Sequence, residues 1–108
     1  MMRLSLRALM RLTLGCITAF SLGLAAQAEV AHIAVAANFT APAKALAAVL
    51  KRDTGHQAQL SFGATGAFYT QIKNGAPFDV LLGADNERTA RLEAEGDTVP
   101  DSRFVYAT

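Results

Sequence analysis

Short apolar segments alternate with amphipathic segments along most of this chain. The short runs are apolar or alternate between apolar and polar residues, as expected of strands in a sheet with a buried face. These runs are residues 30–36, 57–62, 78–83 and 104–106. The longer segments place apolar residues three or four positions apart, which predicts helices. These segments are residues 41–52, 67–73 and 86–95. The alternation predicts an α/β fold with a mostly parallel sheet flanked by helices on both faces.

Residues at the segment ends support these helices. Pro42 fits only a first helical turn, which sets the start of the first helix near residues 38–40. Gly55 supplies its stop, Asn74-Gly75 stops the second helix, and Asp85 is placed to cap the third. Apolar residues on the helices are expected to face the core. They are Ala43, Leu46, Ala47, Val49, Leu50, Phe68, Ile72 and Leu92.

Residues 1–28 have the pattern of a cleavable secretory signal. Three arginines and no acidic residue precede an apolar run over residues 12–26, which ends in the small-x-small sequence Ala26-Gln27-Ala28. A membrane-spanning helix would need roughly 20 strongly apolar residues, but this run is shorter and contains Gly, Ser and Thr. Cys16 lacks the surroundings of a lipid-anchored signal. Cleavage is expected after Ala28, with export of residues 29–108 to the periplasm.

Removal of the signal changes the charge and leaves no cysteine. Without its three arginines the remainder has seven basic and nine acidic residues, a formal charge of −2. Nothing therefore indicates binding to nucleic acid or to an anionic membrane. Without cysteine, residues 29–108 have no disulfide and no thiolate chemistry. His32 and His56 have no metal-binding partner at a suitable spacing.

Two turns after predicted strands carry the most informative polar residues. Residues 37–40 and 63–66 each place a small polar side chain where a helix begins. Helix starts present free backbone N–H groups and a partial positive charge, so two converging starts can bind an anion without Lys or Arg. Asn38 can donate through its amide and Thr65 through its hydroxyl. Gly63 and Gly66 allow a ligand to approach the backbone closely.

Structural roles compete with this interpretation. Asn38, Thr40 and Thr65 are also residue types that cap helices. Tyr69 could line the site, but a half-buried packing role explains it better. Asp85 is better explained as a cap, since a carboxylate would repel an anion.

An enzyme is the weaker alternative. Ser61 lies within a strand and lacks a nucleophile-elbow pattern. Residues 63–66 lack both the lysine of a P-loop and the longer glycine pattern of a dinucleotide site. His32 fits a structural role better than a catalytic one, and His56 fits a solvated loop.

Several stretches resemble the molybdate-binding proteins of ABC importers. They are residues 36–42, 61–66 and 71–80 together with Ala84-Asp85, and the most specific is Asn-Gly-Ala-Pro-Phe-Asp-Val at residues 74–80. The resemblance implies a periplasmic protein of two lobes that close on a molybdate or tungstate oxyanion. It implies that Asn38 and Thr65 bind the oxyanion directly and would contact the metal only through it, with no cofactor.

The resemblance also implies partners and a longer protein. The expected partner is an inner-membrane ABC permease, and the full-length protein is expected to be a monomer. Family members are more than twice as long as residues 29–108, which would form an incomplete first lobe, apparently truncated in the final apolar run. The alternatives are a receptor of the same fold for another anion such as sulfate, and a non-functional fragment.

Overall fold

The computed structural model describes residues 28–108, so the predicted signal peptide lies outside the described residues except for Ala28. Three strands alternate with three α-helices and one short 3-10 helix in the order β1, η1, α2, β2, α3, β3, α4. Their bounds are Val30–Ala36, Ala37–Phe39, Thr40–Thr54, Gln57–Gly63, Thr65–Lys73, Val80–Leu82 and Asn86–Ala94. The predicted alternation is confirmed for the first three strands and the three helices.

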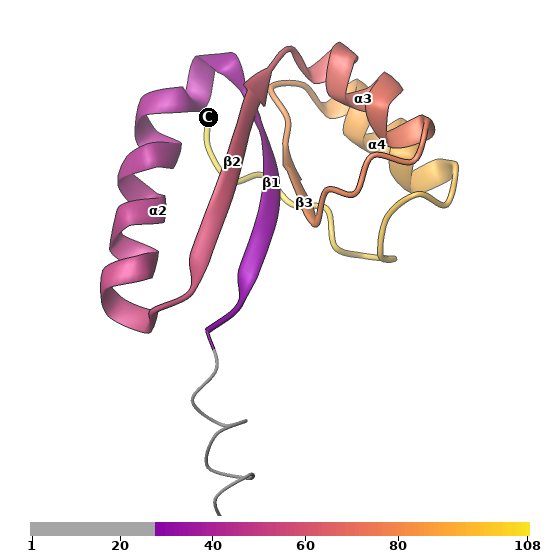
Figure 1. Cartoon of the computed structure of the whole chain (residues 1–108). Helices are drawn as coiled ribbons and strands as arrows, with labels where there is room; N and C mark the ends of the chain where they lie inside the picture. Colours follow the sequence, from indigo (N-terminus) through magenta and orange to yellow (C-terminus); the bar gives the residue numbers. More distant parts are fainter. Residues whose placement is uncertain (1–27) are drawn as a thin grey trace, which may run out of the picture.

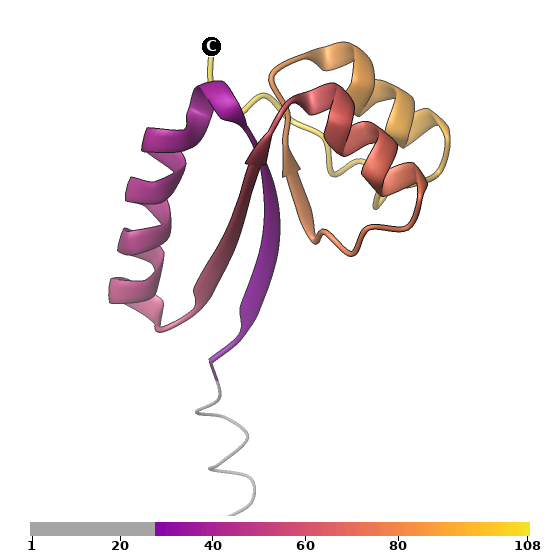
Figure 2. The same ribbon diagram turned by 45° about the horizontal axis from the view of Figure 1, so that its top comes forward.

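The strands form one parallel sheet in the order β2-β1-β3. Ala36 is in register with Gly63 on one side of β1, and Val35 is in register with Leu82 on the other. Helix α2 lies on one side of the sheet, and α3 and α4 lie on the other (Figure 1). Figure 2 shows α3 and α4 side by side above the ends of the strands. This is the predicted α/β fold. The first crossover runs from β1 to β2, and the second runs from β2 past β1 to β3 on its other side.

The predicted helix ends are mostly confirmed. Gly55 ends α2 in the left-handed conformation, with φ of 77°, and its N–H donates to the carbonyl oxygen of Lys51 at 2.9 Å. The Asp85 carboxylate caps α4 by accepting from the backbone N–H of Arg88 at 2.8 Å. Helix α3 begins at Thr65, two residues earlier than predicted.

The core lies at the carboxyl end of β1. Ala34, Val35 and Ala36 are buried there, whereas Val30 at the other end is half exposed. Phe68 from α3 and Leu92 from α4 are also buried, as predicted. The best-packed part of the molecule therefore supports the turns that follow the strands.

Helix α2 forms where it was predicted, but most of its apolar face is not buried. Ala43 is buried, but Leu46 is 61% exposed, and Val49 and Leu50 are also exposed. Among residues 28–108, no other residue of this amphipathic helix is buried. No helix of the described region is long and apolar enough to cross a membrane.

The predicted fourth strand, residues 104–106, is not a strand in the structure. The segment is extended but forms no ladder with the sheet, and Phe104 and Val105 are 77% and 68% exposed. Its apolar composition predicted a strand, but a strand also requires a neighbouring backbone with which to pair.

Candidate anion-binding site

The parallel sheet brings three polar turns to one edge. All three strands point the same way, so their carboxyl ends lie together. Asn38 follows β1, Thr65 follows β2, and Ala84 follows β3. In open α/β sheets this edge is where ligands bind. The two turns singled out in the sequence are therefore brought together, along with a third.

Thr65 is held by the third turn. It is buried, with 6% of its surface exposed, and its hydroxyl oxygen accepts a hydrogen bond from the backbone N–H of Ala84 at 2.9 Å. Because this oxygen acts as the acceptor, the hydroxyl proton remains to be donated elsewhere. The capping alternative is wrong for Thr65, since the N-cap of α3 is Ala64 and no side chain caps that helix.

Asn38 lies in η1 and is exposed. Within residues 28–108 its side-chain amide makes no hydrogen bond. Asn38 does not cap α2, because the N-cap residue is Phe39 and no side chain makes a capping hydrogen bond there. The neighbouring hydroxyl of Thr40 donates to the carbonyl oxygen of Ala37 at 2.7 Å, so it is already engaged. Asn38 is therefore the side chain of this turn with donors available to a ligand.

Two glycines permit close packing behind the site. A Cβ atom on Gly63 would stand 3.2 Å from the ring of Phe68, which packs edge-on against Phe78. A Cβ atom on Gly66 would stand 3.0 Å from the Nε atom of Arg88. An aromatic ring thus covers the backbone at the end of β2, and a guanidinium group covers the backbone in the first turn of α3.

Helix α3 leaves its first backbone donors without partners inside the helix. Phe68 is the first of its residues to close the helical ladder, donating to the carbonyl oxygen of Ala64 at 3.1 Å. The N–H groups of Thr65, Gly66 and Ala67 precede it and have no intrahelical acceptor. These N–H groups and the positive end of the helix dipole favour an anion at this position.

Asp85 has the capping role that the sequence favoured. Besides capping α4, its carboxylate forms an ion pair with the Nη1 atom of Arg88 at 3.1 Å. The hydrogen bond from the Arg88 backbone, followed by its side chain, holds the pKa of Asp85 below its usual value. The carboxylate is therefore ionised and partly neutralised where it stands.

Tyr69 packs away from the strand ends. Its hydroxyl donates to the Glu95 carboxylate at 2.8 Å, and the guanidinium of Arg91 lies over its ring at 4.9 Å. Lys73 joins the same group with ion pairs to Glu95 at 2.7 Å and Asp97 at 2.6 Å. The expected half-buried packing role of Tyr69 is confirmed, and this cluster joins α3 to the end of α4.

Tyr106 is a neighbour of the site that sequence reasoning missed. Its hydroxyl donates to the carbonyl oxygen of Gly83 at 3.0 Å, and its ring meets Phe39 edge-on with centroids 5.0 Å apart. Tyr106 thus connects the turn after β3 with the 3-10 helix that carries Asn38. No local pattern could have indicated this, since Tyr106 is far from both partners in the sequence.

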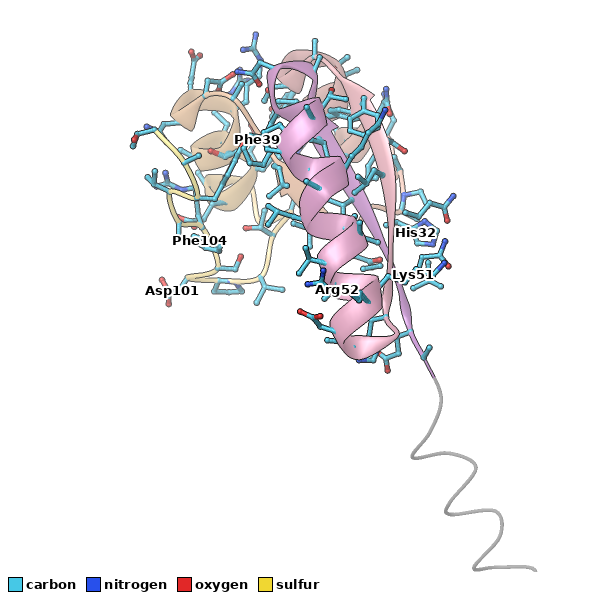
Figure 3. All side chains as sticks on the ribbon, turned by 90° about the vertical axis from the view of Figure 1, so that its left-hand side faces the viewer. His32, Phe39, Lys51, Arg52, Asp101 and Phe104 are labelled. Carbon is cyan, nitrogen blue, oxygen red and sulfur yellow. The ribbon has the colours of Figure 1, made fainter. Side chains whose placement is uncertain are left out.

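Two cations of α2 and both histidines stand apart from this edge. Lys51 and Arg52 lie in the last turn of α2, at the opposite end of the helix from Phe39 (Figure 3). His32 is exposed, and its backbone pairs with Asp79. The Nδ1 atom of His56 accepts from the backbone N–H of Glu29 at 3.2 Å. Residues 28–108 contain no group of three or more His, Asp or Glu residues that could hold a metal ion.

The sequence of this parallel sheet and its turns also matches a known protein family. Over residues 31–108 the sequence matches the family described as bacterial extracellular solute-binding protein. The chain belongs to this family.

Particular relatives are molybdate-binding proteins, which confirms the resemblance seen in the sequence. The molybdate-binding protein ModA of Azotobacter vinelandii is 57% identical over 86 residues, which are 80% of this chain and 34% of that protein. ModA of Rhodobacter capsulatus is 48% identical over 91 residues, covering 82% and 36% of the two chains. This chain spans about a third of the length of these relatives.

Solved structures agree with the sequence relatives. The Azotobacter vinelandii periplasmic molybdate-binding protein superposes with a TM-score of 0.69 at 37% identity, over 70% of this chain and 33% of that one. The substrate-binding domain of a putative molybdenum ABC transporter from Clostridium difficile gives 0.60 at 25% identity, over 63% and 30%.

Proposed function

We propose that this chain supplies part of the first lobe of a periplasmic receptor that captures molybdate, or the near-identical tungstate, for an ABC importer. One observation carries the proposal. The Thr65 hydroxyl oxygen accepts from the N–H of Ala84, so its proton remains available to a ligand, and Thr65 begins α3, whose first N–H groups have no acceptor within the helix. The names of the relatives supply the identity of the anion.

The proposed site binds by hydrogen-bond donors alone. Asn38 and Thr65 would each donate to an oxygen of the tetrahedral dianion, together with backbone N–H groups of the same turns. Such a shell disfavours hydrogen phosphate, because the phosphate proton would face another donor and find no acceptor. The protein binds the anion and releases it to an inner-membrane permease without covalent change. The anion is cargo rather than a cofactor.

Closure by a second lobe would complete the site. Asn38 is exposed in this structure, so a dianion bound here would still face water on one side. A second lobe that supplies further donors would remove the anion from water and strengthen every charge-assisted bond. We propose that residues 29–108 form the first lobe of such a protein, which acts as a periplasmic monomer when complete.

A ligand panel tests this function. A polypeptide extended to the length of the relatives should show saturable thermal stabilisation by sodium molybdate and sodium tungstate, and little by phosphate at neutral pH. Sodium sulfate is the decisive competitor, since it is also a tetrahedral dianion without a proton. Stronger stabilisation by sulfate than by molybdate would assign the same fold to a sulfate receptor. No stabilisation by any of these anions would refute the anion-receptor function.

A further inference from the structure

Arg88 places a cation beside the starts of two helices, where positive charge is usually disfavoured. It lies in the first turn of α4, and its guanidinium also covers the second residue of α3, Gly66. A methyl group on Gly66 would approach the guanidinium atoms Nε, Cζ and Nη2 to 3.0, 3.2 and 3.2 Å. Both helix starts already carry a partial positive charge, so a cation is disfavoured there unless an anion accompanies it.

The negative charge that accompanies Arg88 is the carboxylate of Asp85. Asp85 follows β3 at the same edge of the sheet as Thr65, and its carboxylate binds both the backbone and the guanidinium of Arg88. As the cap of α4 it stabilises that helix, but its charge opposes a dianion arriving at the start of α3. The Arg88 guanidinium contacts both elements: its Nη1 atom pairs with the Asp85 carboxylate, and its Nε and Nη2 atoms lie beside Gly66 in the first turn of α3.

We propose that Arg88 is an affinity-determining residue of the anion site, which cancels the field of the capping Asp85 at the start of α3 without binding the anion directly. The inference rests on the proposed function and deepens it. Arg88 adds a long-range contribution to a site whose direct donors are neutral. The pair allows α4 to keep a carboxylate cap beside a site that must accept a doubly charged anion.

The structure offers a matched control on the same helix. Arg91 is also an exposed arginine of α4, but its guanidinium lies over the Tyr69 ring and pairs with Glu95, away from Gly66. Arg88→Gln and Arg91→Gln therefore remove the same charge from the same helix at two positions. Asp85→Asn removes the opposing charge and keeps a side chain that caps helices well.

The test is a set of calorimetric titrations with sodium molybdate on the polypeptide extended to the length of the relatives. In about 10 mM KCl, Arg88→Gln should weaken binding about threefold to tenfold, and Asp85→Asn should strengthen it by a similar factor. The double variant should return near the parent value, and Arg91→Gln should change affinity less than twofold. In about 0.5 M KCl these differences should shrink below twofold, because salt screens charges that do not touch the ligand.

Two outcomes would overturn the role of Arg88 and leave the proposed function intact. One is equal affinity of the Arg88→Gln and Arg91→Gln variants in a parent that binds molybdate normally. The other is a loss in Arg88→Gln that persists in full at high salt and is not restored by Asp85→Asn, which would show a structural role. A parent that binds no molybdate at either salt concentration would overturn the proposed function, and the inference would fall with it.

Discussion

The hydroxyl of Thr65 and the backbone N–H of Ala84 are joined by a 2.9 Å hydrogen bond that links the turns after β2 and β3. The bond gives a partner to a buried polar side chain, at the edge of the sheet where ligands of this fold bind. Because the hydroxyl oxygen accepts in this bond, the threonine proton remains available for another acceptor. One contact therefore contributes to both the stability of the fold and the chemistry of the candidate site.

Replacing Thr65 by valine should destabilise the unliganded protein. Valine keeps the shape of threonine but leaves the part-buried N–H of Ala84 without its acceptor, which costs about 1–2 kcal/mol of unfolding free energy. Thr65→Ser keeps the hydroxyl and should lose less. Urea denaturation of both variants measures the difference. Equal stabilities for valine and serine would show that the bond to Ala84 contributes nothing.

The network around Glu95 should make stability depend on pH. Hydrogen bonds from Lys73, and then from Tyr69, hold the pKa of Glu95 below its usual value. Hydrogen bonds to Asp97, and then to Glu95, raise the pKa of Lys73. The contribution of Glu95 is therefore present above its unfolded pKa of about 4.5 and is lost as the pH falls through the lower folded value. The contribution of Lys73 is present below about pH 10.5 and is lost as the pH rises further.

Thermal melts of the parent and Glu95→Gln from pH 3 to pH 8 test this network. The parent should melt higher at neutral pH, and the difference should close toward pH 3 as the carboxylate is protonated. Asp53→Asn is a suitable control, because Asp53 pairs only with the adjacent, largely exposed Arg52 among the described residues. A difference in melting temperature between the parent and Glu95→Gln that stays constant across the pH range would contradict the assigned ion pairs.

Much of the fold could be predicted because its signals are local. The pattern around β1 and the left-handed position of Gly55 are properties of a few neighbouring residues, and both were predicted correctly. Asp85 was recognised as a cap for the same reason. The partners of Thr65 and Tyr106 lie 19 and 23 residues away, so neither contact could be seen before the fold was known.

The failures have the same origin. Leu46 and Phe104 are apolar, and apolar residues at these positions predict burial. Burial also requires a facing surface, and within residues 28–108 no element covers them. A pattern shows which face of an element is apolar, but the covering element must be present for that face to be buried.

Residues 29–108 expressed alone should associate as concentration rises. Leu46, Val99, Phe104 and Val105 are each more than 60% exposed, and large exposed apolar side chains favour self-association. Sedimentation velocity at several concentrations should show dimers or larger species, and Phe104→Ser with Val105→Lys should reduce them. A sharp two-state melt of a monomer at all concentrations would contradict this prediction.

Export should yield a protein that begins at Glu29. The prediction rests on the three basic residues, the apolar run and the Ala26-Gln27-Ala28 sequence at the start of the chain. Mass spectrometry of periplasmic material from a Gram-negative host measures the N-terminus. Recovery of the uncleaved chain from the cytosol would refute the signal assignment.

The central claim is that Asn38 and Thr65 donate hydrogen bonds to a bound oxyanion. The most direct measurement is calorimetric titration of sodium molybdate into Asn38→Ala and Thr65→Ala, in a polypeptide of the relatives' length. Each variant should bind about tenfold to a hundredfold more weakly, because a charge-assisted bond to a desolvated dianion is worth about 1.5–3 kcal/mol. Thr40→Ala is the matched control, since its hydroxyl is already engaged with Ala37, and its affinity should stay within twofold of the parent. Parent-like affinity in both Asn38→Ala and Thr65→Ala would contradict the account.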